Sequence, residues 1–569
     1  MKERVVRYSL RELCDFADVP VPAELEHMAD KVFKNVANAP RYVKPGGVYF
    51  ATGLYEPDEE RRAKIKKAIE EGVGIVFVRD LYHDYPELKG FPCVFCPAPF
   101  QTVLKIAADI RRRKGLKVIG ITGSLGKTTT KDFVFDVMKQ HFSVRKSLGN
   151  QNTIFPILDN LQKVNSEYFV QEFGAATPTV MPLTVSACIP DIGIITNISE
   201  PHLDVFGSKE NILKEKIQMI TQMPAGCPAF LNYDDEMLKE VKFEDRPIIS
   251  YAVKNTAADY YAENIRYEDG QMVFEIVHGD KKITARLNIF GEFNVSNAVV
   301  AAAIGDYLGM DAKDIVKGLA EFRGKGTRQN LTSAGGYKLY IDCYNSSPVS
   351  LPGAVKVIES IELKAGGRRI AVLGDMAGRT PGVHAETGKV LSNTKLDLVL
   401  CYGNDNAKIF ADEIGKAGIE TRYTDDRDML DQWVRESVTR DDIVLFKGPT
   451  TRFLVRTIDQ VFGTSYQLNG EKFEFVNDGE YRCKIISEKE AADKKTVALL
   501  EYRGAGKKVK VPSTIRNEKV FAVGPTCFKG NETITNVNIP APIYNISRGA
   551  FRGCRNLKKV DLPATLKII

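Results

Sequence analysis

The chain of 569 residues is too long for one hydrophobic core, and roughly three to four domains are expected. Its hydrophobic content of 44% and charged content of 27% are typical of a soluble globular protein, and its net charge of +6 does not argue for a nucleic-acid or membrane surface. No apolar run reaches the roughly 20 residues of a membrane span, and the N-terminus has no signal-peptide core, so we expect a cytoplasmic protein.

Residues 1–113 predict a small α/β domain. Apolar runs indicate strands and amphipathic or charged runs indicate helices, with strands over 47–51 and 74–78 and helices over 59–71 and 100–113. The spacing of Cys93 and Cys96 is that of metal and redox sites, but no second pair follows, so we interpret the pair as packing, with metal or redox chemistry as the alternative. The basic run from Arg111 to Lys114 is interpreted as a solvated linker rather than a binding patch.

The stretch from Lys117 to Lys131, KVIGITGSLGKTTTK, has the order strand, Gly-rich turn, Lys-Thr and helix. A phosphate-binding loop needs this order, because glycines turn backbone N–H groups towards phosphate oxygens and the helix adds the positive end of its dipole. Lys127 would reach the terminal phosphates, and the Thr128 hydroxyl would bind Mg²⁺. Ile121 replaces the first Gly of the strict motif, so a turn without a ligand is the alternative.

Residues 114–326 contain further strands with polar residues at their ends. The strands over 168–172 and 191–197 end in Glu172 and Asn197, and their uninterrupted apolar runs favour a parallel sheet covered on both faces. Ligands bind beyond the carboxyl ends of such strands, so we expect both residues to meet the loop at one rim. His202 follows in the next loop as a second plausible Mg²⁺ ligand, with an ordinary loop histidine as the alternative.

The other predicted elements of this region are a helix over 209–223, strands within 251–295 and an Ala/Val-rich helix from Phe293 to Leu308. Residues 327–463 predict a second α/β unit with a mainly parallel sheet. Its expected strands are 338–342, 369–373, 397–402 and 442–446, and its expected helices are 350–360, 386–392, 407–417, 428–437 and 451–462.

The tail, residues 464–569, changes character. Phe528 recurs as Phe551 and Ile539-Pro540 recurs as Leu562-Pro563, each 23 residues later. A period in the low twenties with a Pro-closed strand predicts a leucine-rich-type solenoid. Two repeats are fewer than the three or so that stability needs, so the tail is expected to pack on the preceding domain, or to continue in a longer protein.

Several motifs stand in a fixed order that resembles the Mur ligase family. They are GITGSLGKTTTK at 120–131, SLGNQN at 147–152, EFG at 172–174, IITNISEPHLDVFGSKENILKEK at 194–216, FNVSNAVVAAA at 293–303, TR at 327–328, IDCYNSSPVS at 341–350, VLGDM at 372–376 and KGPTTRF at 447–453. The resemblance covers about residues 30–463 and implies an α/β fold of three domains. These are a UDP-sugar-binding-like domain over 1–113, a P-loop ATP-binding domain over 114–326 and a Rossmann-like ligase domain over 327–463, before the repeat tail at 464–569.

The resemblance implies an ATP- and Mg²⁺-dependent amide ligase that works through an acyl phosphate. The segments at 341–350 and 372–376 are most similar to members that add D-alanyl-D-alanine to a UDP-muramoyl tripeptide. The implied phosphate-binding residues are Gly123, Ser124, Gly126, Lys127, Thr128 and Thr129. Thr128 and Glu172 would hold one Mg²⁺, and His202 would help to hold a second.

Lys216 matches the family lysine that is carbamoylated and then binds Mg²⁺, although a solvated helix lysine is the alternative. Asn294 and Asn297 match adenine-side positions, and Arg328 and Asp342 match residues that clamp phosphate and ribose. The catalytic residues that the resemblance implies are Lys127, His202, Lys216 and Arg328. The substrate-binding residues that it implies are Arg41, Asn150 and Asn152.

The chain departs from the family mainly at substrate-facing positions. The family pattern Asp-Ser-Arg near the uridine is replaced here by Ala39-Pro40-Arg41, and the pattern Asn-His-x-Gly-Glu is replaced by residues 176–180. A family Asn is replaced by Thr153, and a family His is replaced by Phe293. Three hypotheses follow. The first is a ligase that adds D-alanyl-D-alanine, and the second is a ligase with another carboxylate acceptor. The third is an inactive Mur-like binding protein whose repeats recruit a protein partner. Retention of the ATP and Mg²⁺ residues argues against the third.

Overall fold

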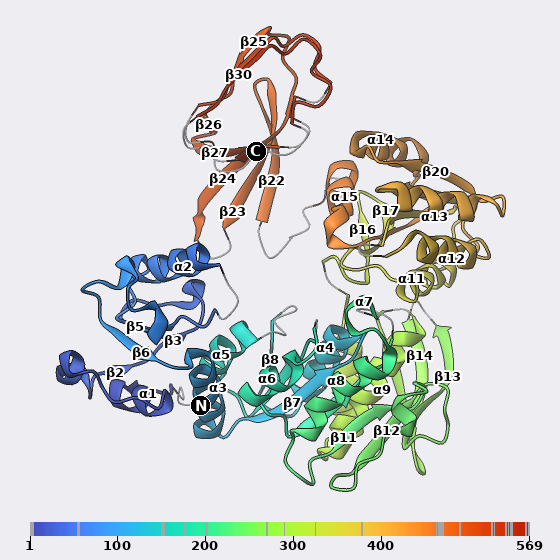
Figure 1. The fold of residues 1–569 in the computed structure, drawn as a ribbon. Coiled ribbons are helices and arrows are strands. Elements are labelled where there is room, and N and C mark those ends of the chain that lie inside the picture. The colour runs from blue at the N-terminus through green and yellow to red at the C-terminus, as the bar shows by residue number, and fades with distance from the viewer. Residues whose placement is uncertain are drawn as a thin grey trace. The chain divides into compact units, whose positions relative to one another are not determined.

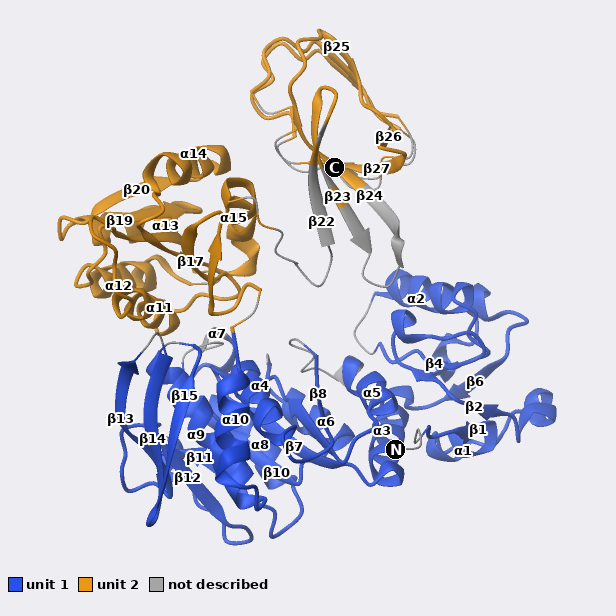
Figure 2. Cartoon of the chain, turned by 180° about the vertical axis from the view of Figure 1, so that it is seen from behind, with its two compact units in different colours: residues 1–323 blue, residues 324–569 orange. Residues whose placement is uncertain are grey.

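The computed structural model describes residues 5–53, 57–148, 154–175, 177–199, 203–268, 271–289, 291–324, 326–376, 379–462, 464, 472–488, 491–524, 527–528, 530–540, 543, 545–546, 550–563 and 566. Two compact units make up the chain, residues 1–323 and residues 324–569 (Figure 2). Within the described ranges, the helices are all too short or too polar to cross a membrane.

The first unit begins with a small parallel sheet in the order β3-β4-β5-β6 (Figure 1). Its strands are β3 (Val36–Ala37), β4 (Val48–Phe50), β5 (Ile75–Arg79) and β6 (Cys93–Cys96), with helices α1 (Leu10–Phe16), α2 (Asp58–Glu70) and α3 (Pro99–Lys114) and an antiparallel pair, β1 (Tyr8–Ser9) and β2 (Val32–Phe33). The predicted strands and helices of this region are confirmed. Cys93 and Cys96 stand three apart in one strand, so they face opposite sides of the sheet and do not suit one shared metal ion.

A nine-stranded sheet follows in the order β15-β14-β13-β12-β11-β10-β7-β9-β8. The strands from β8 to β13 are parallel, and β13 to β15 form an antiparallel meander. The strand bounds are β7 (Lys117–Thr122), β8 (Val144–Lys146), β9 (Tyr168–Glu172), β10 (Ile192–Ile195), β11 (Ala229–Asn232), β12 (Ile248–Ala252), β13 (Tyr260–Glu268), β14 (Gln271–His278) and β15 (Lys281–Leu287).

Helices cover both faces of this sheet, as its uninterrupted apolar strands predict. Val118 and Ile119 are neighbours on β7, yet they are buried in two different cores, one on each face of the sheet. The helices of this part are α4 (Lys127–Met138), α5 (Ile154–Lys163), α6 (Val180–Ala187), α7 (Leu203–Phe206), α8 (Lys209–Thr221), α9 (Glu292–Tyr307) and α10 (Ala312–Glu321). The buried strands therefore determine the positions of the loops that follow their carboxyl ends.

The basic run at the end of α3 is not a solvated linker, and that interpretation was wrong. Lys114 is 3% exposed, and its ammonium donates to the carbonyl oxygens of Leu161, Gln162 and Val164 at 2.7–2.8 Å. These carbonyls lie at the end of α5, where the helix leaves acceptors without partners and favours a cation. The lysine thus ties α3 to α5.

The second unit contains a six-stranded sheet in the order β16-β17-β21-β18-β19-β20, parallel except for β16. Its strands are β16 (Asn330–Ala334), β17 (Tyr337–Asp342), β18 (Arg369–Gly374), β19 (Leu398–Tyr402), β20 (Glu420–Thr424) and β21 (Ile443–Lys447), and its helices are α11 (Ser350–Glu359), α12 (Pro381–Leu391), α13 (Asp405–Gly415), α14 (Arg427–Ser437) and α15 (Leu454–Phe462). The mainly parallel sheet is confirmed, while β16 and β20 were not expected.

In the described residues of the tail, the regular elements are all β-strands. An antiparallel meander comes first, formed by β22 (Lys472–Asp478), β23 (Tyr481–Glu488) and β24 (Ala491–Tyr502). The repeats then form a short parallel sheet of β25 (Lys508–Lys510), β28 (Asn536–Asn538) and β30 (Lys559–Asp561), accompanied by β26 (Thr514–Ile515), β27 (Glu518–Val523) and β29 (Asn545–Ile546). The rings of Phe528 and Phe551 stack at 5.1 Å, so the 23-residue offset is one turn of the solenoid.

The sequence repeat therefore has a third turn, β25, 28 residues before β28 in their shared register. Strand β27 pairs with β24, so the repeats and the meander share one core. Packing of the tail on the preceding α/β unit stays a prediction, and so does the four-part division of the chain.

Candidate functional site

The Gly-rich loop lies between β7 and α4, as the motif predicts. Gly123 has φ +146°, and a Cβ built there would lie 1.9 Å from the Thr196 hydroxyl, so this position requires glycine. Gly126 has φ +81° and is the N-cap of α4. The turn brings the first N–H groups of a twelve-residue helix to the carboxyl end of the sheet, and none of them receives a side-chain cap from Gly126. Such a helix start suits an anion.

Lys127 begins α4, and its ammonium folds back over the loop. The ammonium donates to the carbonyl oxygens of Gly123 at 2.9 Å and Ser124 at 3.3 Å. A cation beside the start of a helix complements the charge of a phosphate chain. These features fit the terminal phosphates of a nucleotide.

The segment that directly follows β10 holds the loop in place. The Leu125 N–H donates to the Asn197 side-chain oxygen at 3.0 Å, and the Ser124 N–H donates to the Asn197 carbonyl at 2.9 Å. The Thr196 hydroxyl donates to the Leu125 carbonyl at 2.6 Å. The expected meeting of the loop with Asn197 at one rim is confirmed.

Glu172 ends β9, the strand next to β7, and faces the same loop. The Thr128 hydroxyl donates to Glu172 Oε2 at 2.8 Å, which confirms that they meet. Two oxygens bound to one Mg²⁺ at 2.0–2.1 Å in octahedral geometry are about 2.9 Å apart. Thr128 and Glu172 already have nearly that separation, and both supply the oxygen donors that Mg²⁺ prefers, so the pair fits the ion.

Lys131 is a member of this group that sequence reasoning did not single out. Its ammonium lies 3.6 Å from Glu172 Oε2, and the side chains of the two residues are 1% and 2% exposed. The signal was present in the motif, because residues 128 and 131 share one face of a helix. Lys131 thus places a cation beside the buried Glu172 carboxylate.

Lys216 lies on α8 and is buried rather than solvated. Its ammonium donates to the Gly123 carbonyl at 3.1 Å. Burial, together with the nearby charge of Lys127, lowers the pKa of Lys216 to about 7. A large part of this lysine is therefore the neutral amine near neutral pH, and that form can react as a nucleophile.

Asn294 and Asn297 lie on α9 and are buried. The Thr130 hydroxyl donates to the Asn297 side-chain oxygen at 2.8 Å, and the Asn297 amide reaches Asn294 at 3.4 Å. Asn297 thus packs against the first turn of α4 through its hydrogen bond with Thr130. Contact of either residue with adenine stays a prediction.

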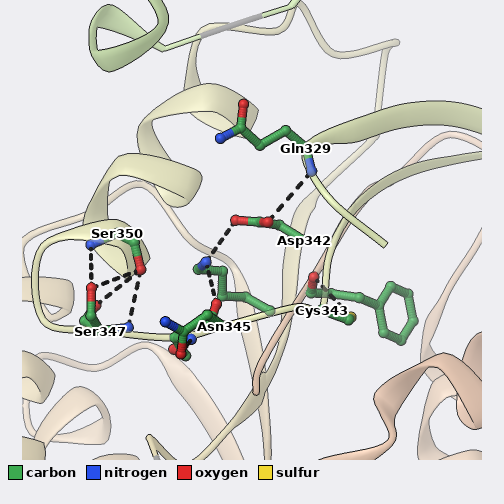
Figure 3. A network of polar contacts seen from close by, with 9 residues as sticks. Gln329, Asp342, Cys343, Asn345, Ser347 and Ser350 are labelled. Atoms are coloured by element: carbon green, nitrogen blue, oxygen red, sulfur yellow. Dashed lines mark hydrogen bonds and ion pairs between the residues drawn. The ribbon is translucent and has the colours of Figure 1, made fainter. Parts of the chain in front are cut away.

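In the second unit, Asp342 is the centre of a polar network (Figure 3). The Lys447 ammonium donates to Asp342 at 2.6 Å and to the Asn345 carbonyl at 2.7 Å, and the Gln329 N–H donates to Asp342 at 3.4 Å. Asp342 and Lys447 are register partners at the carboxyl ends of β17 and β21, a signal that could have predicted the pair. The Arg328 guanidinium lies over the Tyr344 ring, 3.3 Å from its centroid.

The predicted substrate residues are less well placed. Arg41 lies in a short 3₁₀ turn, Pro40–Tyr42, and is exposed, with its guanidinium 4.9 Å from the Tyr42 ring centroid. In the described part of the chain, no contact joins it to the phosphate loop. His202, Asn150 and Asn152 lie outside the described residues.

Comparisons with known proteins agree with this geometry. A family model for the Mur ligase middle domain matches residues 121–305, and a model for the Mur ligase, glutamate ligase domain matches residues 327–450. The chain is 30% identical over 392 residues to UDP-N-acetylmuramoyl-tripeptide–D-alanyl-D-alanine ligase of Bacillus subtilis, which covers 68% of this chain and 84% of that protein. The chain belongs to the Mur ligase family.

Solved structures show the same fold. The MurF crystal structure from Acinetobacter baumannii superposes with a TM-score of 0.69 at 20% identity, covering 81% of this chain and all of that one. MurF ligase from Thermotoga maritima, solved in complex with ADP, superposes with a TM-score of 0.64 at 22% identity, covering 75% of this chain and 97% of that one. Mur ligases are ATP-dependent enzymes that form amide bonds and use Mg²⁺. A third model, a BspA type leucine rich repeat region, matches residues 509–569.

Proposed function

We propose that this Mur ligase joins D-alanyl-D-alanine to a UDP-muramoyl tripeptide, with ATP as the phosphate donor, and that it works in the cytoplasm. The observation that carries the proposal is the group around the phosphate loop: Lys127, the Thr128–Glu172 pair and the buried Lys216. The similarity to the B. subtilis ligase supports the choice of substrates. The substrates are small molecules, a nucleotide-sugar peptide and a dipeptide.

The chemistry divides into two steps. The terminal carboxylate of the tripeptide attacks the γ-phosphorus of ATP, the bond to ADP breaks, and an acyl phosphate forms. The amine of the dipeptide then attacks the acyl carbon, phosphate leaves, the amine loses a proton, and the amide bond is complete. Both steps bring anionic groups together, so the chain's task is mainly to position them and neutralise their charge.

The described residues divide this task. The N–H groups at the start of α4 and the Lys127 ammonium would hold the β- and γ-phosphates, because they point to the same edge of the sheet. Thr128 and Glu172 would hold one Mg²⁺, and His202 would help to hold a second. Bound Mg²⁺ neutralises charge on the phosphates of ATP. Asn294 and Asn297 would contact adenine, while Arg328 and Asp342 would contact phosphate and ribose.

Lys216 would complete the site as a carbamate. A neutral lysine amine adds to CO₂ and releases one proton, which turns a cation into a carboxylate. The lowered pKa of Lys216 supplies the neutral amine that this reaction needs. The carbamate would face the loop near Gly123, where an anionic oxygen ligand suits Mg²⁺.

A second candidate is a ligase of the same chemistry with a different carboxylate acceptor. Arg41 is exposed beside Ala39 and Pro40, positions that offer no side-chain hydrogen bond to a uridine. An acid without a uridine would need no such contact. The two candidates share every residue of the phosphate loop and differ in the substrate.

The test is phosphate release with ATP, Mg²⁺, an acid and D-alanyl-D-alanine, with hydroxylamine added to trap the acyl phosphate as a hydroxamate. The Lys127→Ala variant should lose turnover by about a hundredfold or more. Lys139→Ala is the matched control, because Lys139 lies at the far end of α4 and pairs with Asp136 and Glu321. Absence of phosphate release with every acid, or full activity of Lys127→Ala, would overturn the ligase proposal.

A further inference from the structure

The positive charge of the chain is concentrated in its last part. Residues 503–569, which follow β24, contain thirteen Lys and Arg and three Asp and Glu, a net charge of +10. The preceding 502 residues contain 66 basic and 70 acidic side chains, a net charge of −4. The modest +6 of the whole chain therefore hides a strongly basic repeat region.

Part of this charge lies in register on the repeat sheet. In β25, β28 and β30, Lys508 pairs with Asn536 and Asn536 with Lys559, while Val509, Val537 and Val560 form the adjacent row. The valine row faces the core, with Val509 and Val537 buried, so the lysine row faces solvent. Neighbouring strands are about 4.8 Å apart, so Lys508 and Lys559 are separated by about 10 Å.

We use the name lysine ladder for five exposed lysines in or directly before these strands: Lys507, Lys508, Lys510, Lys558 and Lys559. Lys508, Lys510 and Lys559 belong to the rows that alternate with the valines, and Lys507 and Lys558 directly precede β25 and β30. Only one of them has a described ion pair, the contact of Lys559 with Asp561 at 2.8 Å. Within the residues that the structure describes, no acidic side chain comes within ion-pair distance of the other four. Apart from Lys559, the lysines of the ladder thus have no acidic partner among the described residues.

We propose that the lysine ladder binds the surface of an anionic lipid bilayer. A polybasic surface gains attraction from each lysine that approaches anionic headgroups, without any specific geometry. Lysine suits this contact, because its ammonium is a compact and strongly hydrated charge on a flexible stem. Leu562 is exposed directly after β30 and offers an apolar side chain for shallow contact with the bilayer.

The composition of the ladder favours lipid over other anionic partners. Protein interfaces are enriched in Tyr, Trp and Arg and depleted of Lys, and none of the enriched types stands in β25, β28 or β30. Binding of single-stranded nucleic acid relies on aromatic side chains that stack on bases, and these strands contain no aromatic residue. The strands of the ladder thus carry positive charge, but they lack both the residue types typical of protein interfaces and the aromatic residues that stack on bases.

Binding of the full chain to vesicles tests the proposal. Vesicles of phosphatidylcholine with about 30% phosphatidylserine should bind the chain at about 0.1 M salt and release it at about 1 M, while pure phosphatidylcholine vesicles should not bind it. The Lys507→Gln, Lys508→Gln, Lys510→Gln variant should bind about a hundredfold more weakly, since each lysine contributes about fivefold. The corresponding triple Arg variant should bind like the wild type.

Removal of three exposed lysines elsewhere is the matched control. The Lys89→Gln, Lys242→Gln, Lys254→Gln variant loses the same charge and should keep its vesicle binding. ATP-dependent phosphate release in solution should be unchanged in both triple variants, which shows that they are folded. Equal weakening by the two variants, undiminished binding of the ladder variant, or tighter binding of the wild type to an oligonucleotide than to the vesicles would overturn the proposal.

Discussion

At the scale of single residues, the Lys131 ammonium and the Glu172 carboxylate lie 3.6 Å apart with almost no solvent around them. Such a pair adds little net stability, but removal of one partner leaves an uncompensated buried charge. Glu172 also accepts the Thr128 hydroxyl, so one carboxylate serves both the core and the proposed metal site. The arrangement makes Lys131 a positioning residue for Glu172.

The first prediction concerns Lys131→Met. This variant should lose about 3 kcal/mol of local stability, because Glu172 remains buried without its cation. Hydrogen exchange of the β9 amides measures this loss without assuming that the whole chain unfolds in one step. Lys146→Met is the control, because Lys146 pairs with Asp132 in a partly exposed place and should cost less than about 1 kcal/mol. Adding Glu172→Gln should recover much of the loss, and equal losses in the two single variants would reject this account.

The second prediction concerns Lys216→Ala. Activity should fall to background, because the variant cannot form a carbamate, and short carboxylates such as formate or acetate should restore part of it. Lys214→Ala is the matched control, since Lys214 is exposed two residues away on α8 and should keep its activity. Steady-state phosphate release measures the activity of Lys216→Ala, its recovery with added carboxylates and the activity of Lys214→Ala. Full activity of Lys216→Ala would show that no carbamate is needed.

At the scale of elements, the strands that end at the candidate site could be predicted best. The apolar runs of β7, β9 and β10 are buried on both faces, so pattern and tertiary environment agree. The weaker strands β16 and β20 were missed, because their alternation is interrupted and their side chains are mostly half-exposed. Lys114 was misjudged because its sequence neighbours are charged, while its partners are carbonyls about 50 residues away.

Some residues of the candidate site could likewise be predicted from the sequence, and others were missed. Thr128, Glu172 and Asn197 could be placed from strand ends and one loop motif. Lys131 and Lys447 were missed, because their roles depend on partners from other strands, Glu172 and Asp342. The helical spacing of Lys131 and the strand-end position of Lys447 were signals of a role, but a local pattern does not by itself identify such distant partners.

The third prediction concerns Asp442, which lies directly before β21 and accepts hydrogen bonds from Arg368, the residue directly before β18. Burial opposes ionisation of this carboxyl, but hydrogen bonds from the Arg368 side chain and from the N–H groups of Thr439 and Arg368 outweigh it and lower its pKa. Since the pKa is lower in the folded chain, the stabilisation is present above the unfolded value of about 4 and is lost as the pH falls through the folded value.

Asp442→Asn should therefore cost about 2 kcal/mol near pH 7, and the difference from the wild type should shrink below about pH 4. Trp433, the single tryptophan of the chain, lies on α14 in the same domain, so urea unfolding followed by its fluorescence reports on this domain. Asp441→Asn is the control, because Asp441 is 56% exposed. A difference that stays constant from pH 7 to below pH 4 would contradict this assignment.

At the scale of the whole molecule, a Mur ligase and a basic repeat region share one chain. The ligase part has the Gly-rich phosphate loop, while departures from the family at substrate-facing positions stay a prediction. The period of the tail could be predicted from Phe528 and Phe551, but the third turn could not, because β25 precedes β28 by 28 residues instead of 23. Its basic surface was hidden by the opposite charge of the other residues.

The central claim is that the chain forms an amide bond between a muramoyl peptide and D-alanyl-D-alanine. Mass spectrometry of a reaction with UDP-muramoyl tripeptide, D-alanyl-D-alanine, ATP and Mg²⁺ tests it most directly. We predict a product with the combined mass of the two substrates less one water, formed together with ADP and phosphate in equal amounts and absent with Lys127→Ala. Recovery of both substrates unchanged, while another acid is consumed with ATP, would contradict the claim.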